Sequence, residues 1–380
     1  MNPEDPRAQV AVGLDIGATK IAGGVVEFPA AKILSQRSIA TAPWRGAEVV
    51  LSDCLTLARE LVEMAPALSP GGQPAVGVCM GVPENIDLEG RVTSTNTLAW
   101  RGVPVQDMLG RIAPAVVESD VRAAALAESL WGAGRGARLF VYLTVGSGIS
   151  HTLMIDGAAY LGATGNAITS ASSPLTTECT ECGARLEPVL DHIAGGLALP
   201  RLYNARGARP VESARQVLSL AAENDPVAVD VVRRAGEALG VTAAFLVNVL
   251  DPELLVVGGG LGLAGGLYWG TFLASTRAHI WSDVNRNLPI VTAGTGVAAG
   301  LIGAAAGYGM ALAADEARAA GGGDFGGHLA GSAAVLRASR PTAVNLSWAV
   351  DRQLRALAGV SDPDELTATA WAEAEAIADE

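Results

Sequence analysis

Apolar residues gather in short runs that are broken by glycine-rich turns, and this pattern predicts alternating strands and helices. The segment VAVGLDIGATKIAGGVVE contains two apolar runs, residues 10–16 and 21–27, on either side of the short turn GATK. Two such runs separated by a tight turn predict a β-hairpin. Residues 48–68 instead place apolar residues at helical spacing, which predicts an amphipathic helix.

The same pattern continues through the middle of the chain. Residues 74–83 and 113–120 are apolar runs that predict buried strands, and the helix-like VRAAALAESLWGAG follows the second. Residues 139–155 repeat the opening design of strand, Gly-Ser-Gly turn and strand. A long helix is expected over about 225–249, and the buried strand of DPELLVVGGGLG follows it. Because the strand–turn–strand unit occurs twice, we expect two similar lobes with a cleft between them.

Composition narrows the possible classes of function. The chain has 380 residues, half of them apolar, and a formal net charge of −13. Phosphate backbones are bound by clustered Lys and Arg, so a nucleic-acid partner is not expected. No apolar run of membrane-spanning length and no charged-then-apolar leader is evident, so we expect a cytoplasmic protein without a membrane partner. Four cysteines do not make a disulfide scaffold.

The glycine-rich turns are candidate phosphate-binding sites. Such a turn exposes successive backbone N–H groups, which can form a concave anion site. We expect Gly17, Gly146 and Gly148 to supply positive φ angles and the close approach that a Cβ would block. The candidate nucleotide contacts are Gly17, Thr19, Lys20, Gly146, Ser147, Gly148, Gly258, Gly259 and Gly260. The alternative is that each turn is an ordinary hairpin turn.

In their order and spacing these motifs resemble the ROK family (repressors, open reading frames, sugar kinases) of the actin-like ATPase superfamily. The resemblance begins at GLDIGATKIAGGVV and continues through GVPENIDLEGRVTSTNTLAW, VESDVRAAALAE, DGAAYLGATGNA and DPELLVVGGGLG to AGLIGAAA. It covers residues 10–306 and implies an α/β, two-lobed actin-like ATPase (ribonuclease H-like) fold, with lobes at 1–120 and 121–306. It also implies ATP and Mg²⁺, a small sugar or polyol acceptor, and a homodimer. No helix-turn-helix segment precedes the first motif, so the repressor branch is not expected.

The resemblance assigns roles to individual residues. Asp120 corresponds to the family's catalytic base, and Ser119 stands where the family has Asn. Asp15 resembles the acidic residue near the metal and phosphate. Asn96 and Glu187 match contacts to the acceptor sugar. The alternative for Asp120 is a helix N-cap, because Asp caps helices well.

Two departures from the family pattern change the expected acceptor. Thr169 and Ser172 stand where the family has a Glu and a His that bind sugar hydroxyls. We therefore expect a kinase for a non-glucose acceptor, namely an aminosugar, a deoxysugar or a C7-cyclitol. The alternative is a non-catalytic nucleotide- or sugar-binding relative. Retention of Asp15, both turns and Asp120 favours the kinase.

The cysteine pair of ECTECGARLE is half of a zinc site. Cys179 and Cys182 have ligand spacing, but tetrahedral zinc needs four ligands, and the family's His and one further Cys are missing. Cys54 and Cys79 lie in apolar runs. We expect a relic without metal, unless His192 supplies a further ligand.

The segment 303–380 resembles the N-terminal helical part of 5-methylthioribose-1-phosphate isomerase. The string SRPTAVNLSWAVDRQL carries this likeness, and Arg340 matches a phosphate-contacting Arg of that family. We expect residues 307–380 to form a helical extension that packs on the kinase or on a partner. The alternative is a gene fusion, in which case the acceptor would be a 5-modified ribose.

Overall fold

The first apolar run of the chain forms the central strand of a five-stranded sheet with the order β3-β2-β1-β4-β5. The computed structural model describes residues 9–173, 177–178, 181–207 and 209–306. The expected extension at 307–380, with Arg340, lies outside these residues. The strands of this sheet are β1 (Gln9–Ile16), β2 (Lys20–Phe28), β3 (Lys32–Ala40), β4 (Val78–Val82) and β5 (Ala115–Ser119).

The expected hairpin is confirmed, because β1 and β2 pair antiparallel. β1 also pairs parallel with β4, and β4 pairs parallel with β5. A strand flanked on both sides and covered on both faces needs apolar residues throughout, and β1 is buried over most of its length. The edge strand β3 is instead mostly exposed and carries Lys and Arg, which discourage pairing with other chains.

A second five-stranded sheet has the order β12-β11-β6-β7-β8. It repeats the first design, since β6, β7 and β8 form an antiparallel meander while β11 and β12 run parallel to β6. Its strands are β6 (Leu139–Val145), β7 (Ile149–Ile155), β8 (Ala158–Ala159), β11 (Leu254–Gly258) and β12 (Ile290–Thr292). The two sheets therefore share one topology, and the expected actin-like ATPase fold is confirmed by the solved structures reported below.

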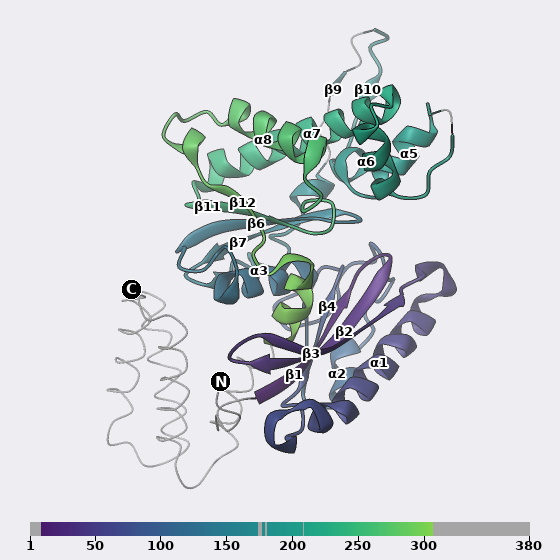
Figure 1. Cartoon of the computed structure of the whole chain (residues 1–380), viewed down its shortest axis with the longest axis vertical. Helices are drawn as coiled ribbons and strands as arrows, with labels where there is room; N and C mark the ends of the chain where they lie inside the picture. Colours follow the sequence, from purple (N-terminus) through teal and green to yellow (C-terminus); the bar gives the residue numbers. More distant parts are fainter. Residues whose placement is uncertain (1–8, 174–176, 179–180, 208, 307–380) are drawn as a thin grey trace. The chain divides into compact units, whose positions relative to one another are not determined.

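Helices cover the sheets (Figure 1). The helix α1 packs on β1 and β2 of the first sheet. In β6, Val141 and Leu143 face the core formed with α7, while Phe140 and Tyr142 face the core formed with α3. The α-helices are α1 (Ala47–Leu68), α2 (Val105–Gly110), α3 (Asp120–Trp131), α4 (Asp191–Ala194), α5 (Ala198–Asn204), α6 (Ala214–Ala222), α7 (Pro226–Leu250) and α8 (Gly266–His279). The single-turn 3₁₀ helices are Pro43–Arg45, Pro70–Gly72, Ser170–Ser172, Asn285–Asn287 and Gly296–Ala298, and a small hairpin joins β9 (Thr177–Glu178) to β10 (Arg185–Leu186).

The long helix α7 begins and ends as its sequence predicts. The Asp225 side chain accepts a hydrogen bond of 2.9 Å from the Ala228 N–H, and Pro226 occupies the first turn. Gly236 and Gly240 lie where a Cβ would meet backbone atoms of α8 at 2.8 Å. These two glycines allow α7 and α8 to pack closely.

The last described helix, residues 299–306, returns to the first sheet. Leu301 and Ala305 share a small core with Ala11 of β1 and Val26 of β2. Gly303 lies against α3, where a Cβ would be 1.6 Å from the Ala123 carbonyl oxygen. Residues 299–306 therefore hold together elements from both halves of the chain.

We expect Gly303→Ala to destabilise the protein. The added methyl group cannot fit against the Ala123 carbonyl, and overpacking of this kind costs about 1–3 kcal/mol or more. Gly110→Ala is the matched control, because a Cβ there meets no atom within 4 Å. Urea unfolding of both variants measures the difference. A Gly303→Ala protein as stable as the control would show that this contact does not hold the helix.

Candidate active site

Two carboxylates meet where three parallel strands end. Asp15 near the end of β1 pairs with Gly81 of β4, and Gly81 pairs with Glu118 of β5. Asp120 follows β5 directly as the first residue of α3. A Cβ on Gly81 would lie 3.5 Å from the Asp120 Cα, so the glycine leaves room for the start of α3 to approach. The carboxyl ends of parallel strands are where α/β sheets bind ligands.

Both carboxyl groups have pKa values above their usual range, mainly because they are buried. Burial raises the pKa of Asp120 to about 7, and the charges of Asp15 and Glu84 add to the shift. Burial also raises the pKa of Asp15 to about 6, against the opposing charge of Lys20. A carboxyl group with a pKa near 7 can accept a proton at physiological pH and release it again.

Asp120 does not occupy the N-cap position of α3. That position belongs to Ser119, whose side chain makes no capping hydrogen bond. The Asp120 Oδ1 accepts a hydrogen bond of 2.7 Å from the Val121 N–H, the next residue of the helix. The N-cap alternative is therefore wrong, although the carboxylate does lie beside the helix N-terminus.

The first glycine-rich turn presents backbone N–H groups that have no acceptor among the described residues. A hydrogen bond of 2.8 Å from the Gly17 N–H to the Lys20 carbonyl closes the turn. Thr41 holds it from outside, with its hydroxyl 2.6 Å from the Gly17 carbonyl and its N–H 3.1 Å from the Thr19 carbonyl. Within the described residues the N–H groups of Ala18 and Thr19 donate to no acceptor. They are available to an anion.

The second turn is built in the same way. The Gly146 N–H donates to the Gly148 carbonyl at 2.9 Å, and the carbonyls of Gly146 and Ser147 accept from Gly196 and Leu197 at 2.8 and 3.1 Å. In the described part of the chain the N–H groups of Ser147 and Gly148 have no acceptor. The carbonyls of the turn are therefore satisfied, while the donors remain for a ligand.

The expectation of positive φ angles at Gly17, Gly146 and Gly148 is wrong, because none of the three is left-handed. Each turn closes through an N–H to carbonyl hydrogen bond without a left-handed glycine. At Gly146 a Cβ would meet no protein atom within 4 Å, so the missing side chain leaves open space. The glycine that does need a positive φ is Gly259, at 79°, where a Cβ would lie 2.4 Å from the Val145 carbonyl oxygen.

The neighbours of Gly259 differ from it. A Cβ on Gly258 would lie 2.1 Å from the Tyr142 hydroxyl oxygen, whereas a Cβ on Gly260 would meet nothing within 4 Å. Gly258 thus serves packing, and Gly260 leaves space at the surface.

A buried carboxylate that the sequence analysis missed holds the loop after β4. Glu84 is almost fully buried and accepts hydrogen bonds from the N–H groups of Asn96, Thr97 and Leu98 at 2.8, 2.6 and 2.7 Å. The Ser94 hydroxyl donates to the same carboxylate. This network fixes the loop and leaves the Asn96 side chain exposed. A lone Glu after a strand gives no sign in the sequence that it will organise a distant loop.

The other residues expected to contact the acceptor are Thr169, Ser172 and Glu187, and their observed contacts are with neighbouring residues. The Thr169 hydroxyl lies 3.4 Å from the Asn166 carbonyl, and the exposed Ser172 contacts Asp191. Glu187 is exposed and pairs with Arg185 at 2.8 Å. No contact of the described residues joins Glu187 to Asp120, so its role in acceptor binding remains a prediction.

The cysteine pair is only partly visible. Cys182 is exposed and free, while Cys179 lies outside the described residues. His192 is exposed, and its carbonyl accepts from Arg201 at 2.7 Å. Burial raises the pKa of the Cys54 thiol to about 12, so this thiol stays protonated. The absence of zinc stays a prediction.

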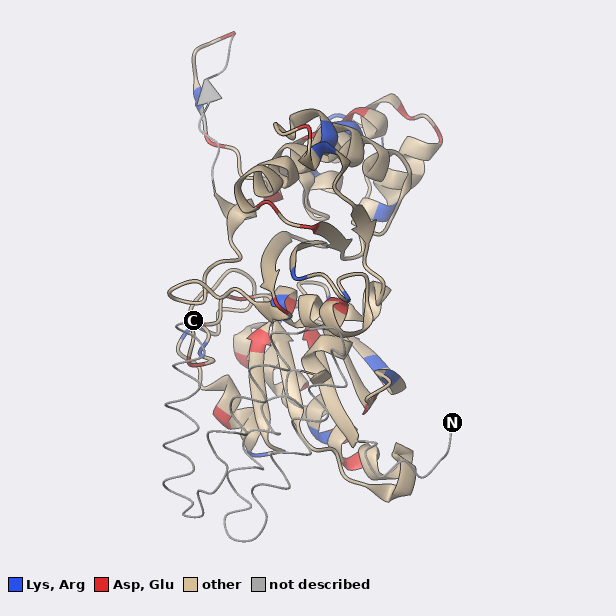
Figure 2. Ribbon diagram, turned by 90° about the vertical axis from the view of Figure 1, so that its left-hand side faces the viewer, with Lys and Arg blue, Asp and Glu red and all other residues tan. Residues whose placement is uncertain are grey.

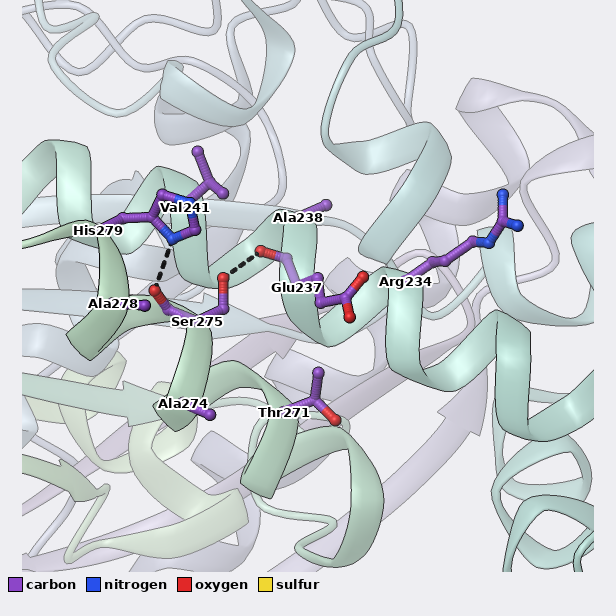
Figure 3. Close-up of a pocket in the computed structure, with 9 residues that line it drawn as sticks. All are labelled: Arg234, Glu237, Ala238, Val241, Thr271, Ala274, Ser275, Ala278 and His279. Atoms are coloured by element: carbon purple, nitrogen blue, oxygen red, sulfur yellow. Dashed lines mark hydrogen bonds between the residues drawn. The ribbon is translucent and has the colours of Figure 1, made fainter.

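A cavity of about 620 Å³ lies between α7 and α8 (Figure 3). Its lining residues are Arg234, Glu237, Ala238, Val241, Thr271, Ala274, Ser275, Ala278 and His279. The Ser275 hydroxyl donates to the Glu237 carbonyl at 2.8 Å, which ties the two helices together. The cavity contains none of the expected site residues and is not the site described above.

Basic and acidic residues are mixed over the described part of the chain. Figure 2 shows Lys and Arg scattered among acidic residues rather than gathered into a basic face over the described residues. Among the described helices, none combines the length and apolar character needed to cross a bilayer.

Family models match nearly the whole chain. The ROK family model matches residues 11–308, and the model of the Initiation factor 2 subunit family matches residues 297–380. The second match covers the segment that resembles the isomerase N-terminus.

Relatives of known activity resemble the first of these regions. A glucokinase of Thermotoga maritima is 27% identical over 318 residues, covering 77% of this chain and 95% of the relative. The N-acetylgalactosamine kinase AgaK of a Shewanella species is 29% identical over 304 residues, covering 77% of this chain and 94% of the relative. The crystal structure of a ROK family glucokinase from Streptomyces griseus with glucose and AMPPNP superposes with a TM-score of 0.66 at 28% identity, covering 78% of this chain and 98% of that one.

We expect Asp120→Asn to change how stability depends on pH. Burial raises the pKa of Asp120 to about 7 from the ordinary aspartate value of 3.8, so the folded protein binds this proton more tightly than the unfolded chain does. The contribution of Asp120 to the free energy of unfolding is fully present below about pH 4 and is lost as pH rises through about 7. The Asn side chain stays neutral, so the variant should gain melting temperature relative to the parent between pH 5 and pH 8.

Asp230→Asn is the control for this experiment. Hydrogen bonds from Arg206 and Arg234 lower the pKa of Asp230, so that carboxylate stays ionised from pH 5 to pH 8. The melting difference between this variant and the parent should therefore be constant over that range. A constant difference for Asp120→Asn as well would contradict the raised pKa.

Proposed function

The chain belongs to the ROK family, and on that premise we propose that it transfers the γ-phosphoryl group of ATP to a hydroxyl of a small sugar or sugar-like polyol. The observation that carries this proposal is the pair of carboxylates Asp15 and Asp120 at the ends of β1 and β5. The two turns with unused N–H groups support it, because a triphosphate needs several such donors. A homodimer in the cytoplasm is part of the proposal by analogy with the family.

Asp120 is proposed as the general base. Its raised pKa matches the requirement that a base hold a proton taken from an alcohol at neutral pH. The Val121 N–H fixes the position of Oδ1 through a bond of 2.7 Å, so the carboxylate is oriented before the acceptor binds. Fixed orientation reduces the entropic cost of the reaction.

The turns and Asp15 are proposed to receive the nucleotide. The N–H groups of Ala18 and Thr19 in one turn, and of Ser147 and Gly148 in the other, would donate to phosphate oxygens. When bound, Mg²⁺ neutralises charge on the phosphate oxygens. The carboxylate of Asp15 fits this ion, since Mg²⁺ takes one or two carboxylates together with phosphates and water.

The acceptor is proposed to be a sugar-like molecule other than glucose, such as a C7-cyclitol, an aminosugar or a deoxysugar. The loop fixed by Glu84 presents Asn96. Thr169 and Ser172 stand where longer Glu and His side chains are expected in the family, so hydroxyls that those groups would bind lose their partners. A site that lacks a hydrogen-bonding group discriminates against a ligand that needs it. The relatives support a variable acceptor site, since they include kinases named for glucose and for N-acetylgalactosamine.

The second candidate is a nucleotide- or sugar-binding protein with weak or no catalysis. The replacement of the family residues at Ser119, Thr169 and Ser172 favours it, because all three stand near the acceptor in the family pattern. Retention of Asp15 and Asp120 with raised pKa values favours the kinase.

We expect Asp120→Asn to lower turnover by about 10²–10⁴-fold, since the amide cannot take the acceptor's proton. The measurement is ATP-dependent product formation over a panel of hexoses, aminosugars, 5-deoxyribose and cyclitols. Asp107→Asn is the matched control, because Asp107 lies in the first turn of α2 and is exposed. Turnover of the Asp120→Asn protein within a few-fold of the parent would exclude Asp120 as the base. ATP binding by the parent without any product from the panel would favour the second candidate.

We expect glucose to be a poor acceptor. Thr169 and Ser172 cannot replace the hydrogen bonds of the longer side chains, so the KM for glucose should exceed the usual range of about 1 μM–1 mM. The double variant Thr169→Glu, Ser172→His should lower that KM. Efficient phosphorylation of glucose by the unchanged protein would show that these two positions do not set the acceptor.

A further inference from the structure

Arg122 is a buried cation two residues after the proposed base. Its side chain is only 3% exposed, although arginine is normally found at the surface. The guanidinium pairs with Glu118 at 2.6 Å, on the strand β5 that leads into α3. A buried charge is tolerated when it is paired and its remaining donors are satisfied.

The rest of the guanidinium joins two loops that are far apart in the chain. One terminal nitrogen donates to the Gly165 carbonyl and the other to the Ile86 carbonyl, both at 3.0 Å. Ile86 belongs to the loop 83–98, which follows β4 of the first sheet. Gly165 belongs to the loop 160–169, which follows β8 of the second sheet. One side chain of α3 therefore bridges a loop from each sheet.

The two loops touch at the same two residues that the guanidinium bridges. Gly165 has a φ of 79°, and a Cβ there would lie 2.1 Å from the Ile86 carbonyl oxygen. Only glycine allows this approach. The close contact brings both carbonyl groups within hydrogen-bonding distance of one planar guanidinium group. The glycine and the arginine thus serve a single junction.

Two of the residues proposed to contact the acceptor lie on these loops. Asn96 is on the first loop, held there by Glu84, and Thr169 is at the end of the second. The ion pair with Glu118 accounts for the charge of Arg122, but it does not require donation to carbonyls of two separate loops. The junction is therefore placed to fix the spacing between the two sides of the acceptor site.

We propose that Arg122 is a positioning residue that locks the loops 83–98 and 160–169 together and thereby sets the affinity for the acceptor. This inference rests on the proposed kinase function. Its effect reaches the acceptor through the loops, whereas the nucleotide turns at 17–20 and 146–148 make no described contact with Arg122. Loss of the junction should weaken acceptor binding without weakening ATP binding.

Arg122→Lys tests the proposal. Lysine keeps the charge and can still pair with Glu118, but a single ammonium group cannot span both carbonyls as the fork does. With the best acceptor of the panel we expect the acceptor KM to rise roughly tenfold or more, because a charge-assisted hydrogen bond is lost. The KM for ATP should stay within about twofold. Amide hydrogen exchange should accelerate in 83–98 and 160–169 and stay unchanged in the nucleotide turns.

Two further variants support the experiment. Gly165→Ala disrupts the same junction at the loop 160–169, because its Cβ has no room against Ile86. This variant should raise the acceptor KM in the same way. Arg233→Lys is the control, since Arg233 is an exposed Arg paired with Asp230 and Glu237 on α7. This control should change neither the acceptor KM nor the ATP KM, and amide hydrogen exchange in both loops should stay the same.

The exchange measurement needs no substrate and so separates the two hypotheses. If the parent phosphorylates no acceptor, the kinase proposal fails, while faster exchange confined to the two loops in Arg122→Lys still supports the junction. Unchanged exchange and an unchanged acceptor KM would overturn the role of Arg122. Equal rises in both KM values with a general increase in exchange would overturn it too, because they indicate a merely structural residue.

Discussion

The site depends on placing two like charges near one another, each of them partly buried. Burial raises the pKa values of Asp15 and Asp120 to about 6 and 7, and the charge of Asp15 adds to the shift of Asp120, so the fold is less stable with both ionised than with one protonated. Two glycines make the arrangement possible. Gly81 lets the start of α3 approach β4, and at Gly300 a Cβ would lie 2.6 Å from the Asp15 carboxylate. A protein under selection for stability alone would not retain such a pair, which is why it indicates function.

Around this pair, buried charged side chains hold backbone groups in place. Glu84 binds the loop that carries Asn96, and Arg122 joins two loops. Glu128, fully buried near the end of α3, accepts from the N–H groups of Ala133, Gly294 and Thr295 at 2.7–2.8 Å, which fixes the segment just before the helix 299–306. Backbone donors and acceptors have fixed directions, so each charge determines the position of a whole loop. Rigid loops of this kind suit a reaction that depends on positioning.

The sequence predicted most of the elements and part of the site. The hairpin of β1 and β2, the helices α1 and α7, and the position of Asp120 after β5 follow from apolar period, turn residues and capping residues, which are local. The φ angles of Gly17, Gly146 and Gly148 were predicted incorrectly, since the hydrogen bonds that close a turn, rather than the presence of glycine, decide its conformation. Glu84 and Arg122 were missed because most of their partners are backbone atoms, up to 43 residues away, which leave no pattern in the sequence.

The two sheets have the same topology but carry different side chains at one equivalent position, the residue two places before each glycine-rich turn. In the first sheet Asp15 of β1 pairs with Gly81 of β4, and in the second Thr144 of β6 pairs with Gly258 of β11. Each of these pairs stands just before a glycine-rich turn with unused N–H donors. A carboxylate at Thr144 would add a third negative charge beside a site that, under the proposed function, must accept a triphosphate, and the repulsion would oppose binding. With a hydroxyl there, the second sheet offers only neutral donors. The repeated topology thus lets one architecture present two glycine-rich turns with free N–H donors, with a carboxylate beside the first turn and a hydroxyl beside the second.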